Sequence, residues 1–341
     1  MTALKDAELD RLTLGFVPLI DCALLVVARE QGFFAEQGLD VTLSRQNAWS
    51  TLRDRVAAGL LDGAQMLAPL PLAMSLGLGR APCDTLAPIV LGRHGNTIAL
   101  SHELSSISGV GYHEDPALSA RSLAGYLGKH PDHRLSLAMV YPHSCQHYEL
   151  RHWLSLGGLD PDRDLDLSVL PPPQMVEALE AGRIDGFCVG EPWGSLAESR
   201  EAGRIVATGA QLWPTPPEKV LGVTRSWAHR YPATLARLIR ALREASHWLS
   251  AAPANRRQAY EWLALPPYLD RSISHLDHLP LDEAPINQQL YGPDMLRPEV
   301  ESASLFAEQM DQQMRASGRR LDRATLDECY SPVHFDATTH Q

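Results

Sequence analysis

Histidine and cysteine side chains gather in the middle of the sequence, where they could bind a metal or attack a substrate. His143, His147 and His152 lie within the segment PHSCQHYELRHW, which also contains Cys145. No carboxylate or cysteine spacing completes a recognised zinc site around these histidines. Cys145 and Cys188 are better explained as small buried residues, and no nucleophile can be paired with a base. The sequence therefore predicts no metal, no catalytic residue and no cofactor, and hence a protein that is not an enzyme.

Residues 171–193, PPPQMVEALEAGRIDGFCVGEPW, have the residue types of a ligand-facing unit. MVEALEAG predicts a short helix ended by Gly182, IDGFCVG predicts a buried strand, and EPW turns the chain at the end of that strand. Open α/β sheets bind ligands at the carboxyl ends of their strands. This stretch therefore favours a solute-binding protein.

Strand and helix patterns alternate through the chain and place that unit in a larger fold. RLTLGFVPL, DVTLSR, GAQMLAP and TIALS predict strands, and Asp21 is a candidate cap for the helix that follows the first of them. The order then restarts with RLSLAMVYP, HYELRHWLSLGG and DLSVLPPP. Two such series predict an α/β fold with two doubly wound lobes.

The lobe boundaries are expected where the chain crosses between the two series. We place the crossings near Ala99 and Leu221, so that lobe 1 comprises residues 1–100 and 220–330 and lobe 2 comprises residues 101–219. Residues 331–341 predict a loose C-terminal tail. The helix TLARLIRALREASHWL sets its leucines on one face, which predicts core packing.

Composition and charge restrict the partners and the compartment. The formal charge of -11 and the scattered basic residues disfavour direct nucleic-acid binding. The run CALLVVA is far shorter than the roughly 20 residues that span a bilayer, so no membrane contact is expected. The first residues lack a signal-peptide pattern, and five dispersed cysteines suit reduced thiols, so a cytoplasmic protein is expected.

Four strings carry a family resemblance: LGFVPLIDCALLVVAREQGFFAEQGLDVTL, GAQMLAPLPLAM, PPPQMVEALEAGRIDGFCVGEPW and PEKVLGVTRSWAHRYP. They resemble the nitrate-binding proteins of the NrtA/NasF family from about residue 10 to about residue 250. The resemblance is greatest to the NasS-type branch, cytoplasmic nitrate and nitrite sensors that control an ANTAR-type antiterminator. It implies a bilobal, periplasmic-binding-protein type II-like fold with the ligand cleft between the lobes.

The resemblance also implies an anion pocket. The family's pocket tryptophan falls on Trp49, and a polar amide from the same lobe falls on Asn96. From the second lobe, a turn residue falls on Pro172, a backbone donor on Gly190 and the cationic residue on Lys219. Without the resemblance, the lysine would be expected in solvent, the tryptophan in the core or a groove, and the asparagine in a turn.

One position departs from the family pattern. The family's histidine at the start of the lobe-2 helix aligns with Gln146, while His147 occupies the next position. Either Gln146 donates its amide to the ligand, which the spacing to Arg151 favours, or a shift of one residue brings His147 inward. The difference affects any pH response, because histidine titrates near neutrality and glutamine does not. Glu191 is a secondary site candidate, or it only holds the turn that exposes Gly190.

Nitrate chemistry fits these residues. Nitrate is planar, singly charged and without a proton to donate, so its site should contain donors only and one positive charge. Lys219, Asn96, Gln146 and the N–H of Gly190 meet that description, and a helix beginning near Ser144 would add further N–H groups. A relative specialised for bicarbonate should present an acceptor or a metal where Lys219 stands. Lysine therefore favours nitrate or nitrite, and Lys219→Glu is expected to abolish binding while leaving the fold intact.

Three functional classes follow. The first is a cytoplasmic nitrate/nitrite sensor that releases an ANTAR-type RNA-binding antiterminator when the anion binds. The second is the substrate-binding component of a nitrate or bicarbonate ABC importer, and the third is an enzyme related to thiamine-pyrimidine synthases. The apparent lack of an export signal favours the sensor.

Overall fold

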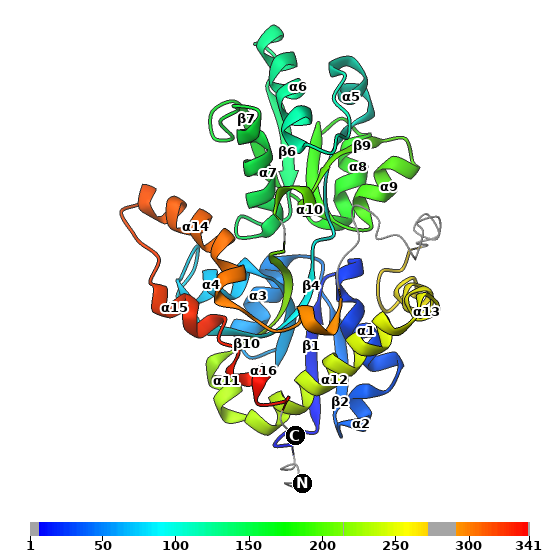
Figure 1. Cartoon of the computed structure of the whole chain (residues 1–341), viewed down its shortest axis with the longest axis vertical. Helices are drawn as coiled ribbons and strands as arrows, with labels where there is room; N and C mark the ends of the chain where they lie inside the picture. The colour runs from blue at the N-terminus through cyan, green and yellow to red at the C-terminus, as the bar shows by residue number, and fades with distance from the viewer. Residues whose placement is uncertain (1–6, 214, 272–290, 340–341) are drawn as a thin grey trace. The chain divides into compact units, whose positions relative to one another are not determined.

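Two α/β units make up the structure (Figure 1). The computed structural model describes residues 7–213, 215–271 and 291–339. The first unit contains the described residues up to Arg93, Pro216–Arg271 and residues 291–339, and the second contains His94–Thr215. Of the predicted lobe 1, residues 272–290 lie outside the described residues.

A mixed five-stranded sheet of order β2-β1-β3-β10-β4 forms the centre of the first unit. Strands β1 and β2 are parallel, as are β1 and β3, whereas β10 is antiparallel to both of its neighbours. Every residue of β3 and β4 is buried, because helices cover both faces of the sheet. The strands are β1 (Arg11–Phe16), β2 (Asp40–Arg45), β3 (Gly63–Leu67), β4 (Thr85–Arg93) and β10 (Pro217–Thr224).

The helices of the first unit come from both ends of the chain. The leucines predicted to form the apolar face of α12 are buried, and α12 packs on α1, which confirms the predicted core helix. The helical elements are η1 (Ile20–Cys22), α1 (Ala23–Glu30), α2 (Phe33–Glu36), α3 (Trp49–Ala57), α4 (Pro69–Ser75), α11 (Arg225–Arg230), α12 (Pro232–Ala251), α13 (Pro253–Leu263), η4 (Pro293–Met295), α14 (Val300–Ala316), α15 (Arg323–Cys329) and α16 (Val333–Asp336).

The second unit repeats this plan with a sheet of order β7-β6-β8-β5-β9. Strand β6 is parallel to β7 and β8, and β5 is antiparallel to β8 and β9. Its core joins the apolar faces of α6 and α7 to the sheet. The elements are β5 (Asn96–Ser101), α5 (His102–Ser108), α6 (Pro116–Lys129), β6 (Leu135–Met139), α7 (Cys145–Leu156), β7 (Leu165–Val169), η2 (Pro172–Gln174), α8 (Met175–Glu180), β8 (Gly186–Gly190), α9 (Trp193–Ser199), β9 (Gly203–Thr208) and α10 (Gly209–Leu212).

The chain crosses between the units earlier than the sequence predicts. Ala99 lies inside β5 and Leu221 inside β10, and each strand is paired along its length within one sheet. Because strand backbone groups need ladder partners, a crossing has to precede its strand rather than interrupt it. The unit boundaries accordingly fall after Arg93 and after Thr215. Asn96, predicted in lobe 1, belongs to the second unit, and Lys219, predicted in lobe 2, belongs to the first.

The predicted loose tail is instead packed onto the first unit as far as the described residues extend. Phe335 is buried, with the guanidinium of Arg243 at 5.1 Å from its ring centroid. Asp336 accepts two 2.8 Å hydrogen bonds from Arg297. The buried ring of Phe335 and the ion-paired carboxylate of Asp336 thus attach this polar C-terminal segment to the first unit.

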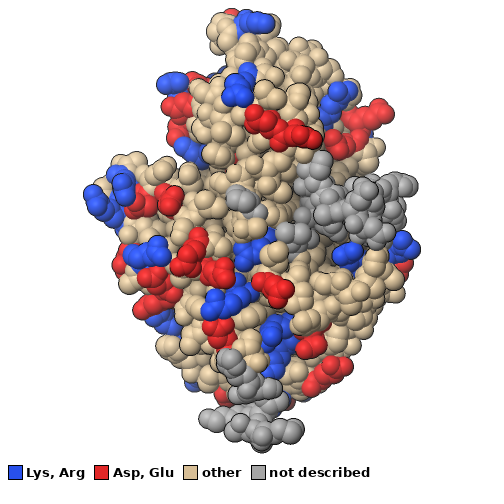
Figure 2. All heavy atoms as spheres, viewed as in Figure 1, with Lys and Arg blue, Asp and Glu red and all other residues tan. Residues whose placement is uncertain are grey.

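The described part of the chain contains no helix that is long and apolar enough to cross a bilayer. On the face shown in Figure 2, acidic and basic side chains are interspersed, and no continuous basic area is visible. That face offers no basic groove of the kind that follows a nucleic-acid backbone.

Candidate functional site

Three side chains from distant parts of the sequence meet at one edge of the first unit's sheet. The carboxyl end of β1 leads to Asp21 in η1, and the carboxyl end of β2 leads to Trp49, the first residue of α3. Lys219 lies near the start of β10, opposite Leu67 at the end of β3. Because β10 is antiparallel, its start lies beside the carboxyl ends of the parallel strands. This is the edge where α/β sheets bind ligands.

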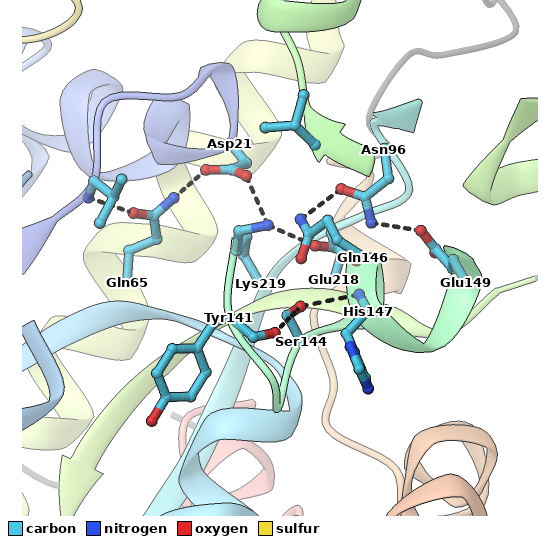
Figure 3. Close-up of polar contacts among 12 residues, drawn as sticks. Asp21, Gln65, Asn96, Tyr141, Ser144, Gln146, His147, Glu149, Glu218 and Lys219 are labelled. Atoms are coloured by element: carbon cyan, nitrogen blue, oxygen red, sulfur yellow. Dashed lines mark hydrogen bonds and ion pairs between the residues drawn. The ribbon is translucent and has the colours of Figure 1, made fainter. Parts of the chain in front are cut away.

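Lys219 is buried between two carboxylates (Figure 3). Its Nζ lies 2.8 Å from Oδ2 of Asp21 and 2.6 Å from Oε1 of Glu218. Gln65 donates from Nε2 to the other oxygen of Asp21 and accepts a 3.0 Å hydrogen bond from the N–H of Val17. Gln65 therefore fixes Asp21 to the core of the sheet, and Asp21 fixes Lys219.

The electrostatics of this cluster differ from the expected donors-only site. Burial lowers the pKa of Lys219, but the attraction of Asp21 and Glu218 outweighs burial and raises it. Burial raises the pKa of Asp21, and Lys219 and Gln65 offset only part of that effect. With both carboxylates ionised, one positive and two negative charges give the cluster a net charge of −1. Lys219 is therefore not the uncompensated positive charge that the sequence predicts.

Trp49 supplies a different kind of donor. It is 1% exposed, and its Nε1 has no hydrogen-bond partner within the described parts of the chain. The Nζ of Lys219 lies 5.6 Å from the centroid of the indole ring, in the range of cation–π attraction. A buried N–H without a partner costs free energy, so this indole is a candidate ligand contact.

The same topology gathers predicted residues at one edge of the second unit's sheet. Asn96 begins β5 and is paired with Gly190, the last residue of β8. The carboxyl end of β7 leads to Pro172 in η2, and that of β6 leads to α7. Ser144 caps α7 by accepting a 3.1 Å hydrogen bond from the N–H of His147, which confirms the predicted helix start.

Asn96 and Gln146 are joined to each other and to a carboxylate (Figure 3). Nε2 of Gln146 donates to Oδ1 of Asn96 at 2.7 Å, and Nδ2 of Asn96 donates to Oε2 of Glu149 at 2.8 Å. All three side chains are buried. The structure thus brings the two predicted amide donors together and adds a glutamate that the sequence analysis did not identify.

The strand register sets the direction in which the amide of Gly190 points. The N–H of Glu191 donates to the carbonyl of Gly95, which makes that pair a hydrogen-bonded one. Such pairs alternate along an antiparallel ladder, so the N–H of Gly190 points away from β5. Glu191 has a local role, because its carboxylate accepts from the N–H and Oγ of Ser195 in the first turn of α9.

His147 adds no positive charge to this edge at neutral pH. Burial, reinforced by nearby Arg151 and His143, lowers the pKa of His147 to about 3. Gln146 has the direct bond to Asn96, but which of these two neighbours faces a ligand stays a prediction. Among the described residues, no group of three or more His, Cys, Asp or Glu side chains is placed to hold a metal ion.

Three carboxylates at these edges were missed by sequence reasoning. Asp21 was expected to cap α1, yet the helix has Cys22 at that position and Asp21 binds Lys219 instead. Glu218 directly precedes Lys219 in the string PEKVLGVTRSWAHRYP, and no role is predicted for it from the sequence. Glu149 follows Gln146 by three positions in a predicted helix, and this spacing on one helical face was a signal that could have identified it.

The family model that matches this chain is described as the NMT1-like family, and it covers residues 5–264. The chain belongs to the NMT1-like family. Two curated relatives come from Synechocystis sp. strain PCC 6803. The nitrate import ATP-binding protein NrtC is 44% identical over 78% of this chain and 38% of its own length. The bicarbonate transport ATP-binding protein CmpC is 40% identical over 78% of this chain and 39% of its own length.

A solved structure of a binding protein shares the whole fold of this NMT1-like chain. The periplasmic nitrate-binding protein NrtA from Synechocystis PCC 6803 superposes with a TM-score of 0.86 at 25% identity, covering 98% of this chain and 89% of that one. The predicted periplasmic-binding-protein fold is thereby confirmed. The chain spans about two fifths of the length of the two curated relatives.

Proposed function

We propose that the protein binds a small planar oxyanion, nitrate or nitrite, as the substrate-binding component of an ABC importer. The observation that carries the proposal is the set of donors at the ligand-binding edges of the two sheets. These are the buried lysine beside an unpartnered indole N–H, and the joined amides of Asn96 and Gln146. The names of the nitrate import relative and of the nitrate-binding neighbour support it.

Bicarbonate is the alternative ligand, and the carboxylates on Lys219 favour it. Asp21 and Glu218 are acceptors, and bicarbonate has a proton to donate to them whereas nitrate has none. The relative named for bicarbonate transport supports the same alternative. Bicarbonate needs a hydrogen-bond acceptor in the site and nitrate does not, so the measured ratio of their affinities distinguishes the two ligands.

Calorimetric titration of the purified protein with nitrate, nitrite, bicarbonate and sulfate tests the proposal. We expect saturable binding of nitrate or nitrite, with thermal stabilisation that grows with ligand excess over the dissociation constant. Binding of bicarbonate alone would establish the alternative. If none of the planar oxyanions binds while a larger anion does, the proposed ligand class is wrong.

The second candidate function is the cytoplasmic sensor that controls an ANTAR-type antiterminator. One observation favours a role other than that of a separate binding protein. The 44% identical relative is an ATP-binding protein, and this chain matches 38% of its length. The only Gly-Lys pair in this sequence is followed by His130, so the similarity does not include a Gly-x4-Gly-Lys-Ser/Thr phosphate loop. Segments of this family thus occur within proteins of other activities.

The sensor, the cytoplasmic location and the absence of enzymatic activity all stay predictions. Cell fractionation distinguishes the first two candidates, because an importer's binding component must work outside the inner membrane. For the sensor, an ANTAR-domain protein should co-purify with the anion-free form and dissociate when nitrate is added. Association that ignores nitrate would rule out release as the mechanism.

A further inference from the structure

Glu149 lies where it can control the donor at Asn96. It is on α7, 1% exposed, and its Oε2 accepts the 2.8 Å hydrogen bond from Nδ2 of Asn96. The carboxylate also lies against the backbone at Gly209, where an added Cβ would be 2.7 Å from Oε1 and 3.1 Å from Oε2. The 2.7 Å distance is shorter than real Cβ contacts, so Glu149 occupies a closely fitted position.

Two hydrogen bonds fix the orientation of the side-chain amides of Asn96 and Gln146, one after the other. A carboxylate oxygen accepts, so Asn96 has to turn its NH₂ group toward Glu149. Its carbonyl oxygen then faces Gln146, which has to present its own NH₂ group, as the 2.7 Å bond shows. Within the described residues, Nδ2 of Asn96 has no other acceptor, so its second N–H is left for a ligand.

We propose that Glu149 is a positioning residue that fixes Asn96 as a hydrogen-bond donor and thereby favours anions that carry no proton. The inference rests on the proposed anion site at Asn96. If the side-chain amide of Asn96 rotated by half a turn, its carbonyl oxygen would take the place of the NH₂ group that donates to the ligand. Nitrate would then face a repulsive oxygen, whereas bicarbonate could donate its own proton to that oxygen.

Glu149→Gln removes the enforced polarity while keeping the size of the side chain. Glutamine can accept or donate, so Asn96 no longer has one favoured orientation. We expect nitrate affinity to fall about threefold to tenfold and the ratio of nitrate to bicarbonate affinity to fall with it. Asp185→Asn is the matched control. It removes a carboxylate that accepts the N–H of Ser136, beside the opposite end of β8 from Gly190, and it should leave both affinities unchanged.

A second variant displaces Glu149 without changing its charge. Gly209→Ala places a methyl group against the carboxylate and should weaken nitrate binding in the same direction. Gly128→Ala is its control, because an added Cβ there meets nothing within 4 Å. If Glu149→Gln does not fold, Gly209→Ala with this control is sufficient to test the inference.

A double-mutant cycle with Asn96→Ala separates positioning from general stabilisation. If Glu149 acts through Asn96, Glu149→Gln should change nitrate affinity much less in the Asn96→Ala background than in the wild type. Equal effects in both backgrounds, or folded variants with wild-type affinity and selectivity, would overturn the positioning role while leaving the proposed function intact. A wild-type protein that binds none of the anions would overturn both.

Discussion

Asp21 and Lys219 form a 2.8 Å ion pair between the carboxyl end of β1 and the start of β10, and neither side chain is more than 4% exposed. With Glu218 on the same ammonium, the lysine expected to attract an anion is already compensated. A buried ion pair gives little net stability, yet removing one partner is costly. The free energy of unfolding, the binding of a charged ligand and the effect of pH on both therefore depend on the same three side chains.

Replacing Lys219 should destabilise the first unit as well as weaken binding. Lys219→Met removes the ammonium group that both buried carboxylates contact, and we expect the free energy of unfolding to fall by about 3–5 kcal/mol in urea titrations. Lys129→Met, at an exposed position, should change it by less than about 0.5 kcal/mol. Adding Asp21→Asn and Glu218→Gln to Lys219→Met should restore much of the loss. A stable single variant would show that the carboxylates are not ionised.

Trp49→Phe tests whether the unpartnered indole N–H contacts the ligand. We expect anion affinity to fall about threefold to tenfold, the effect of one hydrogen bond. Trp153→Phe is the matched control, because Nε1 of Trp153 donates to Oγ of Ser119 at 3.0 Å. Both variants lose the same ring volume, so Trp153→Phe should lose about 1 kcal/mol more stability without losing affinity. Unchanged anion affinity in Trp49→Phe would remove this N–H from the site.

The pKa of His147 predicts a loss of stability in mild acid. Its folded-state pKa of about 3 lies below the unfolded value of about 6.5, so the unfolded chain binds more protons between these values. The contribution of neutral His147 to the free energy of unfolding is therefore complete above about pH 6.5 and is lost as the pH falls. The free energy of unfolding should decrease by about 2 kcal/mol between pH 7.5 and pH 5. His147→Gln should flatten this part of the pH profile. Identical profiles for His147→Gln and wild type would contradict the pKa shift.

The sequence predicts the elements of both units well, because strand and helix patterns are local. The start of α7 at Ser144 and the leucine face of α12 follow from capping and periodicity. The roles of Asp21 and Glu218 do not, because they depend on β10 inserting between β3 and β4, far along the chain. The expectation that Lys219→Glu leaves the fold intact did not include these carboxylates. Because the variant would bury three carboxylates together, we expect it to destabilise the first unit.

Anion binding should be accompanied by proton uptake at the Lys219 cluster. The cluster has a net charge of −1 when both carboxylates are ionised, so an arriving anion favours protonation of Asp21, whose pKa burial already raises. The titratable groups around Asp21 are Lys219, Glu218, Cys22 and Tyr291. Affinity should therefore weaken as the pH rises above the raised pKa of Asp21, by up to about tenfold per pH unit.

Calorimetry in buffers of different ionisation enthalpy measures this uptake directly. We expect a positive uptake of up to about one proton per bound anion in the wild type, by linkage between the two binding events. Asp21→Asn should abolish the uptake and flatten the pH dependence of affinity. Asp62→Asn is the matched control in the same unit, because the carboxylate of Asp62 accepts from the N–H of Thr13 and the indole of Trp227. Nitrate binding with no proton uptake at any pH would show that the cluster accommodates the anion without changing its protonation.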